Sequence, residues 1–419
     1  MRIFFIHQFY RTPEEGGGIR SWYVTRALQK AGHEVTIVAG QMSARDEPSA
    51  VSASEKRDEP SAVSENEERL PTLKLRQLKR REAKVYEAER PEDGVEVIRL
   101  PVGWDNSMSF WERIKAFLKF LYLARKEAKK HEYDMVYAVS VPLSSGLLAM
   151  WTKKPFLFEV GDLWPDVPIQ MRILKNPLLK MLSKRLEKKI YKKADLIISL
   201  SLDIQRHIYQ KWPYTANIVV ENFADLAMFK KQKDESSQNS DIICTYVGTA
   251  GMANDLMQMV ELAKVAEKQF PKIRFYLMIA GKEEEKIKNS APSNVHFIDY
   301  GNKEKVAGLL ARSDFNFVTY AQYPILGTGS PNKFFDGLAA GCISVINVKG
   351  WIEELIIKEK AGIYWDVSDP MALLNSIQNI TEDSDLKHTY QFNALNLAER
   401  FDKDILVHRI VQQIEVRFE

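Results

Sequence analysis

The sequence predicts an α/β protein of two doubly wound, Rossmann-like parallel-sheet domains with a cleft between them. A chain of 419 residues is too long for one hydrophobic core and fits two domains of roughly 200 residues. Apolar strand-like segments alternate with helix-like segments up to about residue 225, and the alternation restarts at residue 242. Such alternation is typical of parallel sheets covered by helices. The polar stretch 226–241 predicts a linker between the two domains.

The first domain, residues 1–225, is expected to contain seven strands. RIFFIH at its start is apolar enough for a central parallel strand, and Gly32 predicts the end of the helix that follows. Between them, Gly16–Gly18 form a loop at the carboxyl edge of the strand, where open α/β sheets bind ligands. The expected strands are 2–7, 33–39, 95–100, 134–139, 155–160, 195–200 and 217–221.

A low-complexity insertion, residues 41–94, interrupts this domain. RDEPSAVSASEK at 45–56 is nearly repeated as RDEPSAVSENEE at 57–68. Its Ser, Pro and acidic content predicts a disordered or loosely helical loop, because such a segment buries little apolar surface. Two copies are too few for a solenoid.

The second domain, residues 242–400, repeats the strand–helix alternation, and residues 401–419 predict a final helix. Its most informative segment is LGTGSPNKFFDGLAAG, Leu326–Gly341. Ser330 is expected to be the N-cap of a helix, with Pro331 at its first position. Lys333 then falls in the first turn, where the helix dipole disfavours a cation by about 0.3–1 kcal/mol. A bound anion would reverse that effect, whereas a lysine leaning into solvent would explain it equally simply.

This segment resembles the donor-binding helix of retaining glycosyltransferases of the GT-B fold, family 4. It is closest to the bacterial O-antigen and capsule branch, similar to UDP-N-acetyl-fucosamine-type transferases. The resemblance implies that Lys333 binds the diphosphate and Asp336 the ribose of a nucleotide sugar. The family usually carries two glutamates eight positions apart. Here the positions hold Thr328 and Asp336, so a carboxylate role at Thr328 is not carried over.

The resemblance also implies a set of donor-binding residues at the strand ends of both domains. The glycines allow close backbone approach to phosphate, and the Gly16–Gly18 loop does not match the dinucleotide fingerprint, which argues against an NAD site. The arginine and lysine that many members use near Gly248 are missing, so more of the diphosphate binding falls to Lys333 and Arg20. The expected donor-binding residues are Gly17, Gly18, Arg20, Gly248, Gly251, Gly281, Thr328, Ser330, Pro331, Asn332, Lys333 and Asp336.

The segment EVGDLWPD, Glu159–Asp166, places three acids and a tryptophan at a strand end. It resembles the cleft-facing DLWP segment of the same family. Asp162 is the first candidate for contacting the sugar or acceptor, so we group it with Lys333 and Asp336 as catalytic candidates. Glu159, Trp164 and His7 are expected on the acceptor side, although a solvated turn, core packing and a structural histidine are the simpler alternatives.

Composition argues against several other classes of protein. No apolar run approaches the ~20 residues of a spanning helix, and the first ten residues do not match a signal peptide. The two cysteines, Cys244 and Cys342, lie in apolar runs and are expected to be buried thiols. The seven histidines show no ligand spacing, so no metal site and no cofactor are expected.

Two amphipathic segments, 110–130 and 172–193, are strongly basic. The second holds nine Lys or Arg against one acid, Glu187. A solvated helix face is the simplest explanation, and nucleic acid is disfavoured because no recognition module is present. The third alternative is the inner face of an anionic membrane, which attracts each basic residue by about 1 kcal/mol. Both segments fall in one domain and carry apolar residues between the charges, which favours the membrane. We therefore expect a cytoplasmic, peripheral membrane protein.

The resemblance thus implies a retaining hexosyl or N-acetylaminosugar transferase acting in surface polysaccharide biosynthesis. The donor is expected to be a nucleotide-diphosphate sugar, of which UDP is favoured, and the acceptor a polyprenyl-diphosphate-linked or other saccharide. Two alternatives remain open. One is a nucleotide-sugar 2-epimerase of the same fold, and the other is a non-catalytic partner subunit.

Overall fold

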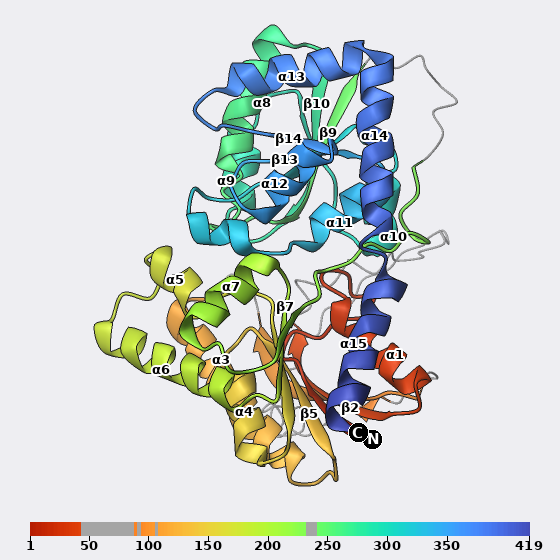
Figure 1. The fold of residues 1–419 in the computed structure, drawn as a ribbon. Coiled ribbons are helices and arrows are strands. Elements are labelled where there is room, and N and C mark those ends of the chain that lie inside the picture. Colours follow the sequence, from red (N-terminus) through yellow and green to blue (C-terminus); the bar gives the residue numbers. More distant parts are fainter. Residues whose placement is uncertain (43–87, 90–93, 105–107, 232–240) are drawn as a thin grey trace, which may run out of the picture.

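The computed structural model describes residues 1–42, 88–89, 94–104, 108–231 and 241–419. They form two α/β domains, one above the other in Figure 1, each built on a mainly parallel sheet with helices on both faces. The predicted fold class is confirmed. The repeated segments 45–56 and 57–68 and residues 232–240 of the expected linker lie outside the described residues.

The first sheet has the strand order β3-β4-β2-β1-β5-β6-β7-β8. All neighbours are parallel except β3 and β4. All seven expected strands are present, and β3 is an addition that the sequence did not suggest. The strands are β1 (Arg2–Ile6), β2 (Glu34–Met42), β3 (Ala88–Glu89), β4 (Glu96–Trp104), β5 (Met135–Ser140), β6 (Phe156–Val160), β7 (Leu196–Ser199) and β8 (Asn217–Val219).

The helices of the first domain begin where side chains can cap them. Ser109 and Glu112 form a capping box at the start of α3, and the Asn176 side chain accepts hydrogen bonds from two amides at the start of α6. The helices are α1 (Arg20–Lys30), α3 (Phe110–Ala128), α4 (Ser144–Thr152), α5 (Asp166–Gln170), α6 (Pro177–Lys193) and α7 (Leu202–Lys211).

The second sheet is entirely parallel, in the order β11-β10-β9-β12-β13-β14. The strands are β9 (Ile242–Thr249), β10 (Ile273–Ala280), β11 (Val295–Phe297), β12 (Phe315–Val318), β13 (Ile343–Ile346) and β14 (Gly362–Tyr364). The helices are α8 (Met257–Gln269), α9 (Glu284–Ser290), α10 (Lys303–Leu310), the 3-10 helix η1 (Pro324–Thr328), α11 (Asn332–Ala339), α12 (Trp351–Lys358), α13 (Pro370–Glu382), α14 (Ser384–Glu399) and α15 (Lys403–Phe418).

The chain crosses between the domains twice, and the two crossings lie side by side. The Ala224 amide donates to the Phe401 carbonyl, and the Lys403 amide donates to the Ala224 carbonyl. After the second crossing α15 packs along α1 of the first domain, which brings the two termini together (Figure 1). The domains are therefore joined by a short pair of strand-like segments at one side of the cleft.

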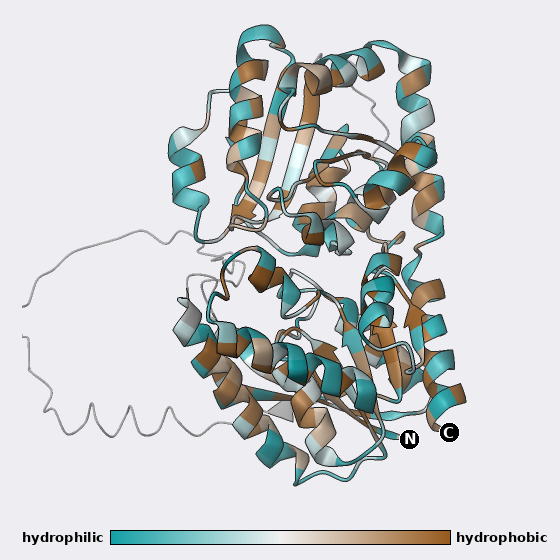
Figure 2. Cartoon of the chain, turned by 60° about the vertical axis from the view of Figure 1, so that its left-hand side comes forward, coloured by the Kyte–Doolittle hydropathy of each residue, from teal (hydrophilic) through white to brown (hydrophobic). Residues whose placement is uncertain are grey.

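Apolar strands form the core of each domain. Figure 2 shows largely hydrophobic strands enclosed by helices that carry polar residues on their outer turns. Cys244 and Cys342 are both buried and free, as expected.

Candidate active site in the cleft between the domains

A cavity of about 380 Å³ opens into the cleft at the carboxyl ends of β1, β5 and β6. His7, Ser140 and Glu159 line it from these strands, and every lining residue except Asn332 comes from the first domain. This is the edge at which open α/β sheets bind ligands. Its volume lies in the usual range for small-molecule sites.

Arg20 and Glu159 form a buried ion pair on the floor of this cavity. Arg20 Nε lies 3.0 Å from Glu159 Oε2, and the two side chains are 8% and 4% exposed. The Tyr137 hydroxyl also donates to Glu159. The remaining Arg20 nitrogens donate to the carbonyls of Val220 and Glu221. All three guanidinium nitrogens of Arg20 thus donate hydrogen bonds within the first domain. The sequence analysis expected this side chain to bind the donor.

His7 lies at the end of β1 beside Ser21 of α1. Its Nδ1 is 2.8 Å from the Ser21 hydroxyl. Burial lowers the pKa of His7 to about 3 because charging the ring would cost its hydration. His7 is therefore neutral at physiological pH and faces the cavity, the side on which an acceptor was expected.

The loop after β6 carries Asp162 into the cleft. Asp162 is exposed, and its carboxyl faces Gly329 of the second domain, where an added Cβ would lie 3.9 Å from Oδ1. Partial removal of water by the two cleft walls raises the pKa of this carboxyl. Trp164 is half-buried, with its ring edge against Phe117 of α3.

Lys333 lies in the first turn of α11 and points towards the end of β9. Its ammonium donates to the Tyr246 hydroxyl at 2.7 Å and to Asn254 Oδ1 at 3.4 Å. A Cβ added at Gly248 would lie only 2.9 Å from Lys333 Nζ, so glycine leaves room for the lysine. Burial lowers the pKa of Lys333 to about 7, and no carboxylate among the described residues pairs with it.

The start of α11 differs from the expectation by one residue. The helix begins at Asn332, and Pro331 is the N-cap in an extended conformation. Ser330 was expected to be the cap, but its hydroxyl accepts a hydrogen bond from the Asn222 amide of the first domain. The interdomain contact takes the oxygen that would otherwise cap the helix. Thr328 also contacts the first domain, because its carbonyl accepts from the Ser201 hydroxyl at 2.6 Å.

Asp336 forms a buried ion pair with Lys303 at the start of α10. Lys303 Nζ lies 2.6 Å from Asp336 Oδ2, and each residue is 7% exposed. Burial raises the pKa of Asp336, and the adjacent ammonium opposes that shift. The pairing of Lys303 with Asp336 was not predicted, because nothing in the local sequence pattern connects two residues 33 positions apart.

Two of the expected donor-site glycine loops differ in what they approach: the Gly16–Gly18 loop meets the other domain, and Gly281 and Gly251 pack within their own. An added Cβ at Gly18 would lie 3.1 Å from Asn332 Nδ2, and one at Gly16 would lie 3.3 Å from the Gly301 carbonyl. Gly281 has a φ of +143°, and a Cβ there would lie 2.6 Å from the Ala250 carbonyl. Gly251 lies in the loop after β9, next to Ala250, and a Cβ added to it would be 3.6 Å from the Thr249 side chain. The Gly16–Gly18 loop therefore reaches the starts of α10 and α11 across the cleft.

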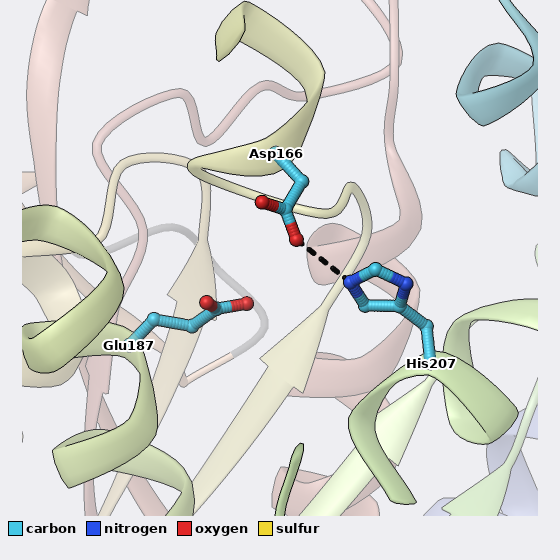
Figure 3. A group of neighbouring side chains, drawn as sticks. All are labelled: Asp166, Glu187 and His207. Atoms are coloured by element: carbon cyan, nitrogen blue, oxygen red, sulfur yellow. Dashed lines mark hydrogen bonds and ion pairs between the residues drawn. The ribbon is translucent and has the colours of Figure 1, made fainter. Parts of the chain in front are cut away.

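Three residues that meet at the end of the EVGDLWPD segment could hold a metal ion. Asp166, Glu187 and His207, from α5, α6 and α7, offer ligand atoms within 4.8 Å of one another (Figure 3). Lys211 Nζ, however, lies 2.6 Å from Asp166 and 2.7 Å from Glu187. The ammonium thus stands between the two carboxylates, and we interpret the group as an ion-pair network that ties the three helices together. The sequence analysis missed it because the residues are widely separated.

Comparisons with known proteins agree with the fold and with each domain. Residues 15–220 match the model of a glycosyl transferase 4-like domain, and residues 243–383 match that of the glycosyl transferases group 1. An uncharacterized glycosyltransferase, MJ1069 of Methanocaldococcus jannaschii, is 23% identical over 244 residues. That match covers 54% of this chain and 60% of the relative's length.

Solved structures share the fold over nearly the whole chain. Sucrose-phosphate synthase from Thermosynechococcus elongatus superposes with a TM-score of 0.70 at 15% identity, covering 100% of this chain and 99% of that one. Anabaena Alr3699/HepE, solved with UDP-glucose, gives a TM-score of 0.63 at 15% identity, covering 99% and 100%. At such identities the likeness concerns the two-domain architecture alone.

Proposed function

The chain belongs to the glycosyltransferases of the GT-B fold, and from this we propose that it moves a sugar from a nucleotide-diphosphate sugar to a saccharide acceptor, retaining the configuration at the anomeric carbon. The observation that carries the proposal is Lys333. Its ammonium lies in the cleft beside Gly248, at the start of α11, without a carboxylate partner among the described residues. A diphosphate would supply the missing negative charge.

The second domain is the proposed donor site. Binding of a diphosphate beside Lys333 would restore full protonation of the ammonium and add charge-assisted hydrogen bonds. Ser330–Asn332 lie at the start of the same helix, α11, and Asp336 lies about one turn further along it. UDP is the favoured nucleotide, since Alr3699/HepE was solved with UDP-glucose. We retain Asp336 as a candidate ribose ligand, with Lys303 holding its carboxylate in place.

The proposed chemistry rests on stabilising the leaving group. The bond between the anomeric carbon and the diphosphate oxygen breaks, the acceptor hydroxyl oxygen attacks the same face, and its proton passes to the diphosphate. The Lys333 ammonium and the amides at the start of α11 would stabilise the developing negative charge. We propose that these groups serve without a metal cofactor. Asp162, which faces the cleft, is the candidate for orienting the reacting sugar or acceptor.

The outer helices of the first domain support a membrane-bound acceptor. Among the described residues, no helix is both long enough and apolar enough to pass through a bilayer. On α3, however, Trp111, Leu118 and Tyr122 are 65%, 60% and 58% exposed, and on α6 Leu178 and Leu182 are 57% and 48% exposed. Exposed basic residues lie among them: Lys115, Lys119, Arg125, Lys184, Arg185, Lys188 and Lys189.

Exposed aromatic and basic side chains together are typical of a surface that binds anionic lipid. We therefore propose a peripheral membrane protein that acts on a polyprenyl-diphosphate-linked glycan in bacterial O-antigen or capsule synthesis. Flotation with anionic vesicles tests this part of the proposal. Binding that persists in a Trp111→Ser/Leu118→Ser/Leu182→Ser variant would contradict it.

The donor proposal is tested by thermal shift with UDP, GDP, TDP and ADP, each with and without Mg²⁺. One diphosphate should stabilise the protein, by about 2.7 kcal/mol at a hundredfold excess over its dissociation constant, independently of metal. No response to any of them would favour a non-catalytic partner subunit. Conversion of a UDP-sugar to its epimer without acceptor would identify an epimerase instead.

A further inference from the structure

We propose that Arg11 binds a phosphate group carried by the acceptor, so that the cavity in the first domain takes a phosphorylated sugar or a sugar linked through phosphate to a lipid. This inference rests on the proposed transferase function and specifies the chemical class of its acceptor. Arg11 lies just beyond β1 and lines the cavity together with His7 and Phe9. The sequence analysis did not identify it.

The charges in the cavity leave Arg11 as its uncompensated cation among the described lining residues. Arg20 and Glu159 neutralise each other, and burial keeps His7 uncharged. Arg11 Nη1 donates only to the Glu15 carbonyl, at 3.3 Å, and no carboxylate among the described residues lies within ion-pair distance of it. A guanidinium with free donors in a cleft suits a phosphate, which can accept two parallel hydrogen bonds.

The carboxylate of Glu15, the residue whose carbonyl Arg11 contacts, is engaged by other partners. The Glu15 carboxylate accepts from the Thr12 amide at 2.7 Å and pairs with Arg99 at 2.7 Å. Arg99 also donates to the Tyr10 carbonyl. This arrangement keeps the Glu15 carboxylate engaged and leaves the Arg11 guanidinium available to a ligand.

Two buried polar atoms on the cavity wall also lack a partner. The Ser140 hydroxyl and Asn222 Oδ1 make no hydrogen bond with any residue that the structure describes, although these two residues are only 5% and 7% exposed. Both residues line the cavity, and the side-chain nitrogen of Asn222, Nδ2, is held in place because it donates to the Ser330 carbonyl. Buried polar atoms without partners are costly, and sugar hydroxyls would satisfy them. Phe9 and Trp104 pack edge to face with their ring centroids 4.7 Å apart, and they add an apolar wall for a sugar ring.

The position of the cavity favours the acceptor over the donor as the source of the phosphate. Lys333, the proposed partner of the donor diphosphate, does not line it, and every lining residue but Asn332 belongs to the first domain. Its aromatic wall extends to the buried side of α3, because Trp104 stacks on Phe117 with the ring centroids 5.2 Å apart. The same helix carries, on its other side, the exposed residues proposed above to meet the membrane.

The test compares the binding of glucose 1-phosphate and of glucose to the full chain, in the presence of saturating UDP, by titration calorimetry. Wild type should bind glucose 1-phosphate at least about tenfold more tightly than glucose. Arg11→Gln should remove this preference and leave the UDP affinity within about twofold of wild type. Arg11→Lys should keep part of the preference, and Arg409→Gln, which changes an exposed arginine on α15, should keep all of it.

Four outcomes are informative beyond the expected one. If Arg11→Gln weakens UDP binding tenfold, Arg11 serves the donor diphosphate and the proposal is overturned. If wild type binds UDP but does not prefer glucose 1-phosphate, the Arg11 proposal fails while the transferase proposal stands; if UDP does not bind, the transferase proposal fails. A decyl phosphodiester of glucose that binds as tightly as glucose 1-phosphate supports a lipid-linked source of the phosphate.

Discussion

On each wall of the cleft, a cation that is paired with a buried carboxylate can be compared with one that has no carboxylate partner among the described residues. On the wall of the first domain, Arg20 is bonded to Glu159, whereas the one partner of Arg11 in the described part of the chain is a backbone carbonyl. On the wall of the second domain, Lys303 is bonded to Asp336, whereas Lys333 contacts a hydroxyl and an amide oxygen. We call Arg20 and Lys303 the paired cations, and Arg11 and Lys333 the open cations.

This difference separates structural from ligand-binding roles more reliably than residue type does. A paired cation donates a hydrogen bond to a buried carboxylate, so its removal leaves that carboxylate without its counter-charge. An open cation is kept in the cleft without such a partner, so its removal costs little stability but deprives a ligand of its counter-charge. The comparison therefore predicts opposite phenotypes for similar substitutions.

The largest expected effect is that of Arg20→Met on stability. The substitution strands the Glu159 carboxylate, 3% exposed, and should lower the free energy of unfolding by about 3–5 kcal/mol. Urea denaturation measures this change. Arg11→Met, on the same wall, should change stability by no more than about 0.5 kcal/mol. An Arg20→Met protein of wild-type stability that has lost affinity for UDP would mean that Arg20 is a donor ligand after all.

The two lysines of the second domain provide a matched pair. Lys303→Met should destabilise the protein by about 3 kcal/mol, because Asp336 loses its partner in a buried site. Lys333→Met should leave the unfolding free energy nearly unchanged and weaken UDP binding by about 1.5–3 kcal/mol, the value of a hydrogen bond to a charged group. Calorimetric titration and denaturation of both variants measure the contrast. Similar profiles for the two would remove the distinction between paired and open cations.

A smaller effect concerns His7, which is uncharged in the folded protein. Its pKa is about 3 when folded and about 6.5 when unfolded, so the unfolded state binds more protons between these values. Stability should therefore fall as the pH drops below 6.5, with His7 contributing at most about 1.4 kcal/mol per pH unit. His7→Gln should flatten that part of the profile. Equal slopes for the two proteins would show that His7 is solvated and free to titrate.

The sequence predicted the fold more completely than the site. Strands such as RIFFIH and helices such as Asn302-capped α10 follow from local periodicity and capping, which neighbouring residues determine. Lys333 could be singled out because it breaks a local rule at a helix start. Arg20 and Glu159 are 139 positions apart in the sequence, and Lys303 and Asp336 are 33 positions apart, so both pairs depend on the folding of the chain. A single sequence gives no measure of such contacts, so Arg20 was expected in the donor site and Arg11 was not identified.

The Ser330 cap shows the same limit on a smaller scale. Ser-Pro before an apolar helix predicts an N-cap, and the local pattern alone offers no other use for the hydroxyl. In the structure the fold brings the backbone N–H of Asn222 across the cleft, and this N–H donates to the Ser330 hydroxyl oxygen. Interdomain contacts therefore decide details that local rules leave open.

The most direct test of the account is the pH dependence of UDP binding to wild type, Lys333→Met and Lys333→Arg. The pKa of Lys333 is about 7 in the free protein, so a bound diphosphate must draw a proton onto the amine above that pH. Wild-type affinity should then fall about tenfold per pH unit between pH 8 and 9.5. Lys333→Arg, which stays charged, should bind with little pH dependence, and Lys333→Met should bind weakly throughout. Equal, pH-independent affinities for all three proteins would contradict the assignment of Lys333 to the donor diphosphate.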